Sequence, residues 1–163
     1  MMIRMTTAVR TARAADLETI ADFNVAMALE AEHKRLDPDT VRRGVAAALA
    51  DPAKGRYFIA ERDGRVVGQL MITFEWSDWR NGVFWWIQSV YVHPQARQSG
   101  VFTALFRHLE AQAKSQPGVC GLRLYVEDGN TRAQATYRRC GMADGGYRVM
   151  EIDYSDAVRP AGE

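Results

Sequence analysis

A polar turn between an apolar strand and an amphipathic helix is the part of this 163-residue sequence best suited to bind a ligand. The apolar run 90–92 stops before Pro94, and the turn 97–101, Arg-Gln-Ser-Gly-Val, leads into apolar residues at helical spacing. A helix N-terminus offers unpaired N–H groups and a partial positive charge, so it can hold a phosphate or pyrophosphate. Gly100 lets the backbone approach that anion closely. We therefore expect a phosphate-bearing cofactor here; the alternative is an ordinary helix entry.

Two motifs, the turn at 97–102 and a second one at 130–142, follow one another as in the GNAT superfamily of acyl-CoA N-acyltransferases, which this sequence resembles. The family's pyrophosphate loop reads Gln or Arg, two residues, Gly, one residue, and then Gly or Ala. Residues 97–102 match it except at the end, where Phe102 stands. The second family motif is an Asn, an Ala, a Tyr, and a Gly followed by an apolar residue. It is supplied here, at the family's usual spacing, by Asn130, Ala133, Tyr137 and Gly141-Met142.

The resemblance implies a role for each matching residue. The backbone of 90–92 would pair with the pantetheine amides like an added strand, and the amides of 98–102 would hold the pyrophosphate. Asn130 would fix the pantetheine arm. Tyr137 would lie near the thioester sulfur, where a phenol with a pKa of about 10 can protonate the departing thiolate; core packing is its alternative. The expected cofactor-binding residues are Val90, Tyr91, Val92, Arg97, Gln98, Ser99, Gly100, Val101, Phe102, Asn130 and Tyr137.

Phe102 stands where the family has a small residue. Its large side chain could narrow the channel beside the phosphates or tilt the helix. It could instead point into the core, because it lies in register with Leu105, Phe106 and Leu109. This register favours the core, and acetyl-CoA is the expected co-substrate.

The group that would accept the proton of the amine is less evident. An alkylammonium must lose a proton before its nitrogen attacks a thioester. Some family members carry a Glu on the central strand for this task, but the comparable stretch 84–88 has no carboxylate. Glu30 and Glu32, at the end of the first predicted helix, and Glu75 are the candidates. Each could act through a water chain or bind a cationic amine, and the alternative for the first two is a solvated helix face.

Tryptophans are concentrated close to Glu75, at positions 76, 79, 85 and 86. They indicate either core and hairpin packing or an aromatic wall for the acceptor, with cation–π contacts. Aromatic rings beside carboxylates suit a small cationic or amphipathic amine better than an acidic one. The predicted catalytic residues are therefore Tyr137, Glu30 and Glu75, and the predicted substrate-binding residues are Glu30, Glu75 and Trp76.

The composition, 47% hydrophobic and 25% charged, is that of an ordinary globular protein. A net charge of +1 gives no reason to expect nucleic acid or an anionic membrane as a partner, and no apolar stretch approaches the length of a membrane span. The scattered histidines lack metal-ligand spacing, so no metal site is predicted. Cytoplasmic location is the default. A homodimer is expected by analogy with the family, through Trp85-Trp86 or the last strands.

Hydrophobic periodicity predicts one α/β domain over 1–163. Asp63-Gly64 should close a hairpin, and Thr131 and Gln134 should form a capping box. The expected class is a GNAT-like mixed, largely antiparallel sheet of about six to seven strands with helices on both faces. The strands are expected at 6–13, 57–61, 66–74, 82–92, 120–127 and 147–154, and the helices at 17–32, 38–49, 102–113 and 131–140.

The resemblance implies an N-acetyltransferase that moves an acetyl group from acetyl-CoA to a primary amine of a small molecule. The amine would attack the thioester directly in a ternary complex. The alternatives are acetylation of a protein at a lysine or N-terminus, and a non-catalytic CoA-binding module. Asn130 and Tyr137 count against the second alternative, and Phe102 counts slightly for it.

Overall fold

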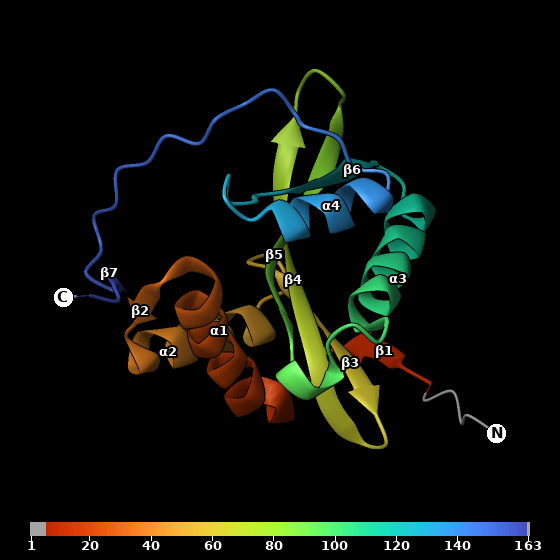
Figure 1. The fold of residues 1–163 in the computed structure, drawn as a ribbon. Coiled ribbons are helices and arrows are strands. Elements are labelled where there is room, and N and C mark those ends of the chain that lie inside the picture. The colour runs from red at the N-terminus through yellow and green to blue at the C-terminus, as the bar shows by residue number, and fades with distance from the viewer. Residues whose placement is uncertain (1–5, 163) are drawn as a thin grey trace.

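A sheet in the order β1-β3-β4-β5-β6 forms the centre of the molecule (Figure 1). The computed structural model describes residues 6–162, so the first five residues and the last one of the predicted domain lie outside it. Strand β6 is parallel to β5, and the other neighbours are antiparallel. The strands are β1 (Ala8–Thr11), β3 (Arg56–Arg62), β4 (Arg65–Ser77), β5 (Gly82–Val92) and β6 (Val119–Leu124).

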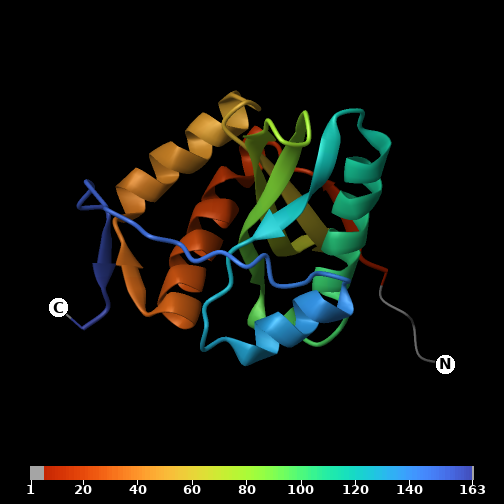
Figure 2. The same ribbon diagram turned by 90° about the horizontal axis from the view of Figure 1, so that it is seen from above.

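Helices cover both faces of this sheet, which confirms the predicted fold class. Figure 2 shows α1 and α2 on one side and α3 and α4 on the other. No helix within residues 6–162 is long and apolar enough to cross a membrane. The helices are α1 (Leu17–Glu32), α2 (Pro38–Ala50), α3 (Val101–Ser115) and α4 (Thr131–Arg139), with short 3-10 turns η1 (Ala14–Asp16) and η2 (Pro94–Ala96).

The central strands are apolar on both faces because each face has its own core. In β3, Tyr57 and Ile59 pack with Ile20 and Val45 under α1 and α2. Phe58, between them, belongs to the larger core under α3, and Leu70, Ile72, Trp85, Leu105 and Leu109 belong to it as well. This period-two alternation is the reason why β3 and β5 read as continuous apolar runs in the sequence.

The residue that caps the start of α4 differs from the prediction. Asn130 is the N-cap, and its side-chain oxygen accepts a hydrogen bond from the Ala133 amide at 3.1 Å. Gln134 donates instead to the carbonyls of Glu127 and Asp128, so the predicted capping box does not form. An Asn is a stronger cap than a Thr, and it takes the position.

The C-terminal part of the chain also departs from the prediction. The central sheet has five strands, and residues 147–154 are not a strand. Instead β7 (Val158–Pro160) pairs antiparallel with β2 (Lys34–Leu36), and the Asp37 amide donates to the carbonyl of Ala157. The predicted strand at 147–154 is therefore wrong: a strand also needs a partner edge, which a local pattern cannot specify.

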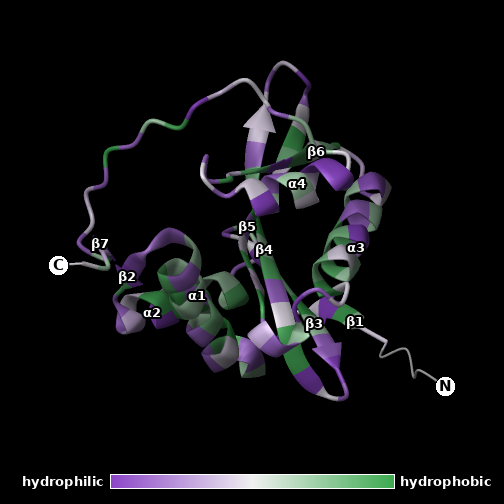
Figure 3. Ribbon diagram, in the orientation of Figure 1, coloured by the Kyte–Doolittle hydropathy of each residue, from purple (hydrophilic) through white to green (hydrophobic). Residues whose placement is uncertain are grey.

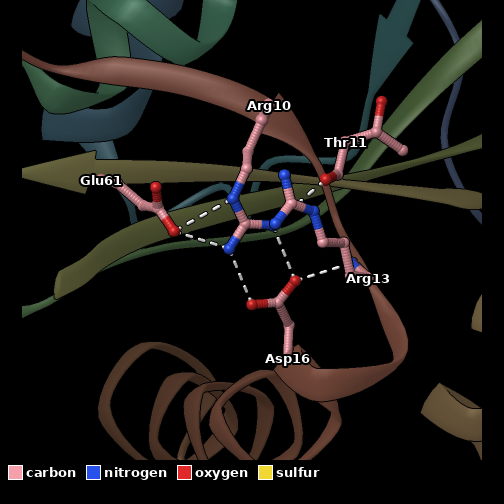
Figure 4. Close-up of polar contacts among 5 residues, drawn as sticks. All are labelled: Arg10, Thr11, Arg13, Asp16 and Glu61. Carbon is pink, nitrogen blue, oxygen red and sulfur yellow. Dashed lines mark hydrogen bonds and ion pairs between the residues drawn. The ribbon is translucent and has the colours of Figure 1, made fainter. Parts of the chain in front are cut away.

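A polar cluster fixes the first turn of the chain to the sheet (Figure 4). The Arg10 guanidinium in β1 donates to both carboxylate oxygens of Asp16, at 2.8 and 2.9 Å, and to Glu61 of β3 at 2.6 Å. Asp16 also accepts a hydrogen bond from the Arg13 amide, so it caps η1. The Arg10 guanidinium holds the pKa of the Asp16 carboxyl below its usual value.

Candidate active site

One edge of β5 is free where the resemblance places the pantetheine arm. Pairing of β5 with β6 ends at Ile87, opposite Leu124, whereas β5 itself continues to Val92. Residues 88–92 therefore have β4 on one side and, among the described residues, no strand on the other. The predicted cofactor strand, Val90, Tyr91 and Val92, lies in this unpaired part. Its backbone can accept an extended ligand as a further strand.

The turn 97–100 has the geometry of an anion-binding loop. Gln98 and Gly100 have φ values of 60° and 84°, in the left-handed region, and Gly100 is the N-cap of α3. The Arg97 amide donates to Pro94, and the next backbone hydrogen bond among the described residues runs from the Ala104 amide to Gly100. The amides from 98 to 103 are left available, as expected at a helix start for a phosphate.

Two arginines, one of them in the loop itself, hold this loop in place. Arg62 of β3 donates to both the hydroxyl and the carbonyl of Ser99, each at 2.6 Å. Arg97 donates to the carbonyl of Val92 at 2.9 Å and forms an ion pair with Glu30 of α1 at 2.6 Å. Arg62 is a site residue that sequence reasoning missed, because it precedes a hairpin turn and nothing local marks its contact with residue 99.

Gly68 of β4 allows the start of α3 to lie against the sheet. A Cβ at this position would meet Val101 Cγ1 at 2.8 Å and the Tyr91 carbonyl oxygen at 3.2 Å. Because the first helical residue lies this close, the amide-rich end of α3 is fixed relative to the free edge of β5. Close approach is what requires a glycine here.

A bulge interrupts the pairing of β4 with β5 next to this loop. The register shifts between Gln69, opposite Tyr91, and Met71, opposite Gln88, and Ser89 has a φ of 51°. The Gln69 side-chain amide donates to the Ser89 carbonyl at 3.2 Å. A trans peptide points its C=O and N–H in opposite directions, so the Val90 N–H points away from Gln69. Bulges of this kind re-aim backbone groups near active sites.

Buried polar side chains support the bulge. The Gln69 amide also donates to Asn24 of α1 at 2.7 Å, and Asn24 donates to the Tyr57 hydroxyl at 3.1 Å. Gln69 is fully buried, and its side-chain oxygen has no partner among the described residues. Burial raises the pKa of Tyr57, which therefore stays neutral. Sequence reasoning missed these hydrogen bonds as well, because they join α1, β3 and β4, which are far apart in the sequence.

A cavity of about 370 Å³ lies beside the bulge, between α1, α2 and the sheet. Its polar lining at one side is Asn24, Tyr57 and Ser89. Of the described residues that line it only Lys54 is charged, and it is paired with Asp51 at 2.9 Å. Pockets of this size hold small organic ligands. Gly44 of α2 also lines the cavity and has no side chain. The other lining residues are apolar: Met27, Leu36, Val41, Val45, Ala48 and Met71.

Comparison with known proteins decides the family. The family model described as "Acetyltransferase (GNAT) family" matches residues 17–142. The chain belongs to the GNAT acetyltransferase family. No curated protein matches it.

Solved structures agree with this assignment. A possible acetyltransferase from Clostridium difficile 630 is 44% identical, with a TM-score of 0.85 over 91% of this chain and 98% of that one. A predicted acetyltransferase with acetyl-CoA from Clostridium acetobutylicum has the same fold at 16% identity, with a TM-score of 0.72 over 91% and 96%. A ribosomal-protein-alanine N-acetyltransferase from Brucella melitensis biovar Abortus 2308 has it at 17%, with a TM-score of 0.73 over 92% and 100%.

This GNAT enzyme is an acetyl-CoA-dependent acetyltransferase. The free edge of β5 and the unpaired amides at the start of α3 fit the two ends of that co-substrate, its amide-bearing arm and its pyrophosphate. Phe102 does not block the loop, because it packs against the core under α3, as its helical register predicted. Its ring meets the Tyr137 ring edge-on, with centroids 5.6 Å apart.

Tyr137 lies in the last turn of α4, facing the start of α3. The Met142 amide donates to its carbonyl, and Gly141, with a φ of 91°, ends the helix as predicted. Burial raises the pKa of the Tyr137 phenol above its usual value, so the proton is retained well beyond neutral pH. Asn130, the other motif residue, has its side chain engaged in capping α4.

The predicted acceptor residues, Glu30, Glu75 and Trp76, do not lie together around the cavity. Glu30 accepts hydrogen bonds from Arg97 and from the Tyr91 hydroxyl, and the Arg97 guanidinium lowers the pKa of Glu30. Glu75 pairs with Arg123 of β6 at 2.5 Å, and Trp76 beside it is 61% exposed. None of these three lines the cavity beside Ser89. Glu75 lies four residues beyond Met71 along β4, a distance of about 13 Å.

The tryptophans do not form one aromatic wall. Trp85 is buried in the core and Trp79 is exposed, while Trp86 stacks on Tyr125 with centroids 4.3 Å apart. Within residues 6–162 no three potential ligand side chains are grouped to hold a metal ion.

Proposed function

We propose that this acetyltransferase acetylates a small primary amine that carries an apolar body and no second positive charge. The observation that supports this is the cavity beside Ser89, which adjoins the bulge and is lined mainly by aliphatic and thioether side chains. An amine at its polar side, near Ser89, would meet a thioester bound along the free edge of β5. The apolar body would fill the space between α1 and α2.

The charges around the cavity favour such an acceptor over a polycation. Among the described residues no carboxylate lines the cavity, and its charged lining side chain, Lys54, is already paired with Asp51 at 2.9 Å, so a second positive charge would find no partner there. Apolar surroundings also lower the pKa of a bound ammonium. The acceptor would therefore enter with its nitrogen largely deprotonated, having given its proton to water. Glu30 and Glu75 remain predictions as bases, and their arginine partners weaken the case for both.

The transfer would then use groups from the bulge and from α4. The amine nitrogen attacks the thioester carbon, so a C–N bond forms and the C–S bond breaks. The Val90 N–H, oriented through Gln69, would donate to the thioester oxygen. Tyr137 would give its proton to the departing sulfur. The proton that the new amide nitrogen sheds passes to water, and Tyr137 regains its own proton from water.

Amines of one length and different charge test the acceptor class. We expect thiol release from acetyl-CoA to be fastest with pentylamine, intermediate with 5-aminopentanoate and slowest with 1,5-diaminopentane, with at least about tenfold between the first and the last. Lys54→Glu should reverse the preference between the two charged amines. Preference of the wild-type enzyme for the diamine would contradict the proposal, and so would thiol release with none of the three.

A variant that fills the cavity tests whether the acceptor amine binds there. A Cβ at Gly44 would meet nothing within 4 Å, so Gly44→Leu can be accommodated and would occupy acceptor space. We expect it to raise KM for pentylamine at least about tenfold and to leave KM for acetyl-CoA unchanged. Ala50→Leu, exposed at the end of the same helix, is the control and should change neither. An equal effect of both variants would place the acceptor elsewhere.

A further inference from the structure

A second cavity, of about 670 Å³, lies beside the β2–β7 ladder. It is bounded by β2, by the start of α2 and by the C-terminal arm, residues 143–162. Figure 3 shows hydrophilic residues, in purple, on β2 where this small sheet lies beside α1 and α2. Of the lining residues that the structure describes, four are charged: Arg35, Asp37, Asp156 and Arg159. The space is large enough for a small organic molecule, so these charges decide which one fits.

The two arginines of this cavity stand directly opposite each other in the ladder. Arg35 of β2 pairs with Arg159 of β7, so both side chains leave the same face of the antiparallel pair, with Cβ atoms about 5 Å apart. Neither guanidinium forms an ion pair with a carboxylate of residues 6–162. Like charges in opposite positions destabilise the pairing of two strands. A carboxylate between the two guanidinium groups would remove this repulsion, because its two oxygens can accept hydrogen bonds from both.

The two carboxylates of the cavity differ in their availability. Asp37 is occupied as the N-cap of α2, where its side chain accepts hydrogen bonds from the amide and the hydroxyl of Thr40. The Asp156 carboxylate has no hydrogen bond or ion pair within the described part of the chain. Asp156 lies next to one of the arginines, because the Arg159 Nε donates to its backbone carbonyl at 3.4 Å. The cavity therefore offers a cationic pair and an anionic group beside it.

We propose that this cavity binds a free α-amino acid in its zwitterionic form. The α-carboxylate would lie between Arg35 and Arg159, and the α-ammonium would pair with Asp156. Leu36 and Ala157, also in the lining, suit an aliphatic side chain. A simple anion would leave Asp156 without a partner, and a simple amine would leave the arginines opposed, whereas a zwitterion matches both signs. The proposal does not depend on which amine is acetylated.

Three ligands of similar shape separate the two charges. NMR titration at pH 6.5 without acetyl-CoA should show that leucine binds the wild-type protein with a dissociation constant in the millimolar range or below. 4-Methylpentanoate, which lacks the ammonium, and leucinamide, which lacks the carboxylate, should each bind at least about tenfold more weakly. Leucine should also slow hydrogen exchange in β2 and β7, because it holds the two strands together. Equal affinity for the three ligands would overturn the proposal, and so would the absence of leucine binding.

Variants of the lining assign each charge to its partner. Arg159→Gln should weaken leucine binding at least about tenfold, whereas Arg148→Gln, an exposed arginine of the same arm outside the cavity, should leave it unchanged. Asp156→Asn should weaken leucine binding to a similar extent and leave the affinity for 4-methylpentanoate as it is. If Asp156 only competes with the ligand for the arginines, Asp156→Asn will instead bind 4-methylpentanoate more tightly, and the proposal is wrong.

A further variant separates this cavity from the proposed acceptor cavity. Gly44 lines the acceptor cavity and does not line the cavity beside the ladder. Gly44→Leu should therefore leave the dissociation constant of leucine unchanged. A loss of leucine binding in Gly44→Leu, with binding retained in Arg159→Gln, would place the amino acid in the acceptor cavity and contradict the assignment.

Discussion

Phe102, the residue that departs from the family loop motif, packs against the residue proposed to donate the proton. Its edge-on contact with Tyr137 joins the first turn of α3 to the last turn of α4. The register of Phe102 with Leu105 and Leu109 was enough to predict its burial. Gln69 and Ser89 could not be found in that way, because their roles come from a register shift between two strands. A β-bulge has no characteristic spacing of apolar residues by which it could be recognised in the sequence.

Removal of the Tyr137 hydroxyl should slow the reaction without disturbing the fold. Tyr137→Phe keeps the ring against Phe102, so we expect an unchanged melting temperature and a fall in kcat of about 100-fold or more. Because burial raises the pKa of this phenol, the wild-type rate should not fall through loss of its proton below pH about 10. Steady-state rates from pH 6 to 10 for both proteins measure this. A fully active Tyr137→Phe enzyme would exclude the role.

At the scale of elements, most predicted helices and strands are confirmed because their boundaries are marked locally. Asp37 caps α2, where its side chain accepts a hydrogen bond from the Thr40 amide, and Asp63-Gly64 closes the β3–β4 hairpin. The small sheet of β2 and β7 was not predicted, since each strand has only three residues. The contact of Arg62 with the anion loop likewise joins segments 37 residues apart.

Loosening the anion loop should weaken binding of the co-substrate and leave the chemistry alone. Arg62→Met removes both hydrogen bonds to Ser99, so we expect a rise in the acetyl-CoA dissociation constant of about tenfold. The acceptor KM should not change. Arg65→Met, an exposed arginine across the same hairpin, is the control for lost charge. If the two variants bind acetyl-CoA equally well by calorimetry, the loop does not need Arg62.

At the scale of the molecule, one partly buried cluster joins the first described strand and η1 to β3. Arg10, Asp16 and Glu61 connect β1, η1 and β3, so the cluster holds the base of α1 beside the core that it covers (Figure 4). The sequence predicted the covered faces of the sheet but not this connection. Arginines occur throughout the sequence, and nothing local distinguishes Arg10 from the others.

The pH dependence of stability should report this cluster. The folded pKa of Asp16 is lowered, so its contribution is present above the unfolded value of about 3.9 and is lost as pH falls through the folded pKa. Asp16→Asn should cost about 1–3 kcal/mol at pH 7, and the difference from wild type should shrink below pH about 4. Glu18→Gln, in an exposed pair with Arg42, should change the melting temperature little. A difference that stays constant down to pH 2 would contradict this account.

The β2–β7 ladder connects the acceptor cavity with the C-terminal segment. Leu36, opposite Val158 in that ladder, lines the acceptor cavity and also a second cavity of about 670 Å³ bounded by Ser155, Asp156 and Ala157. One wall of the proposed acceptor cavity is thus shared with the C-terminal arm. Binding of an amine and the position of the arm are then linked equilibria. Linkage is reciprocal, so an amine that favours one position of the arm must bind that form more tightly by the same factor by which it stabilises it.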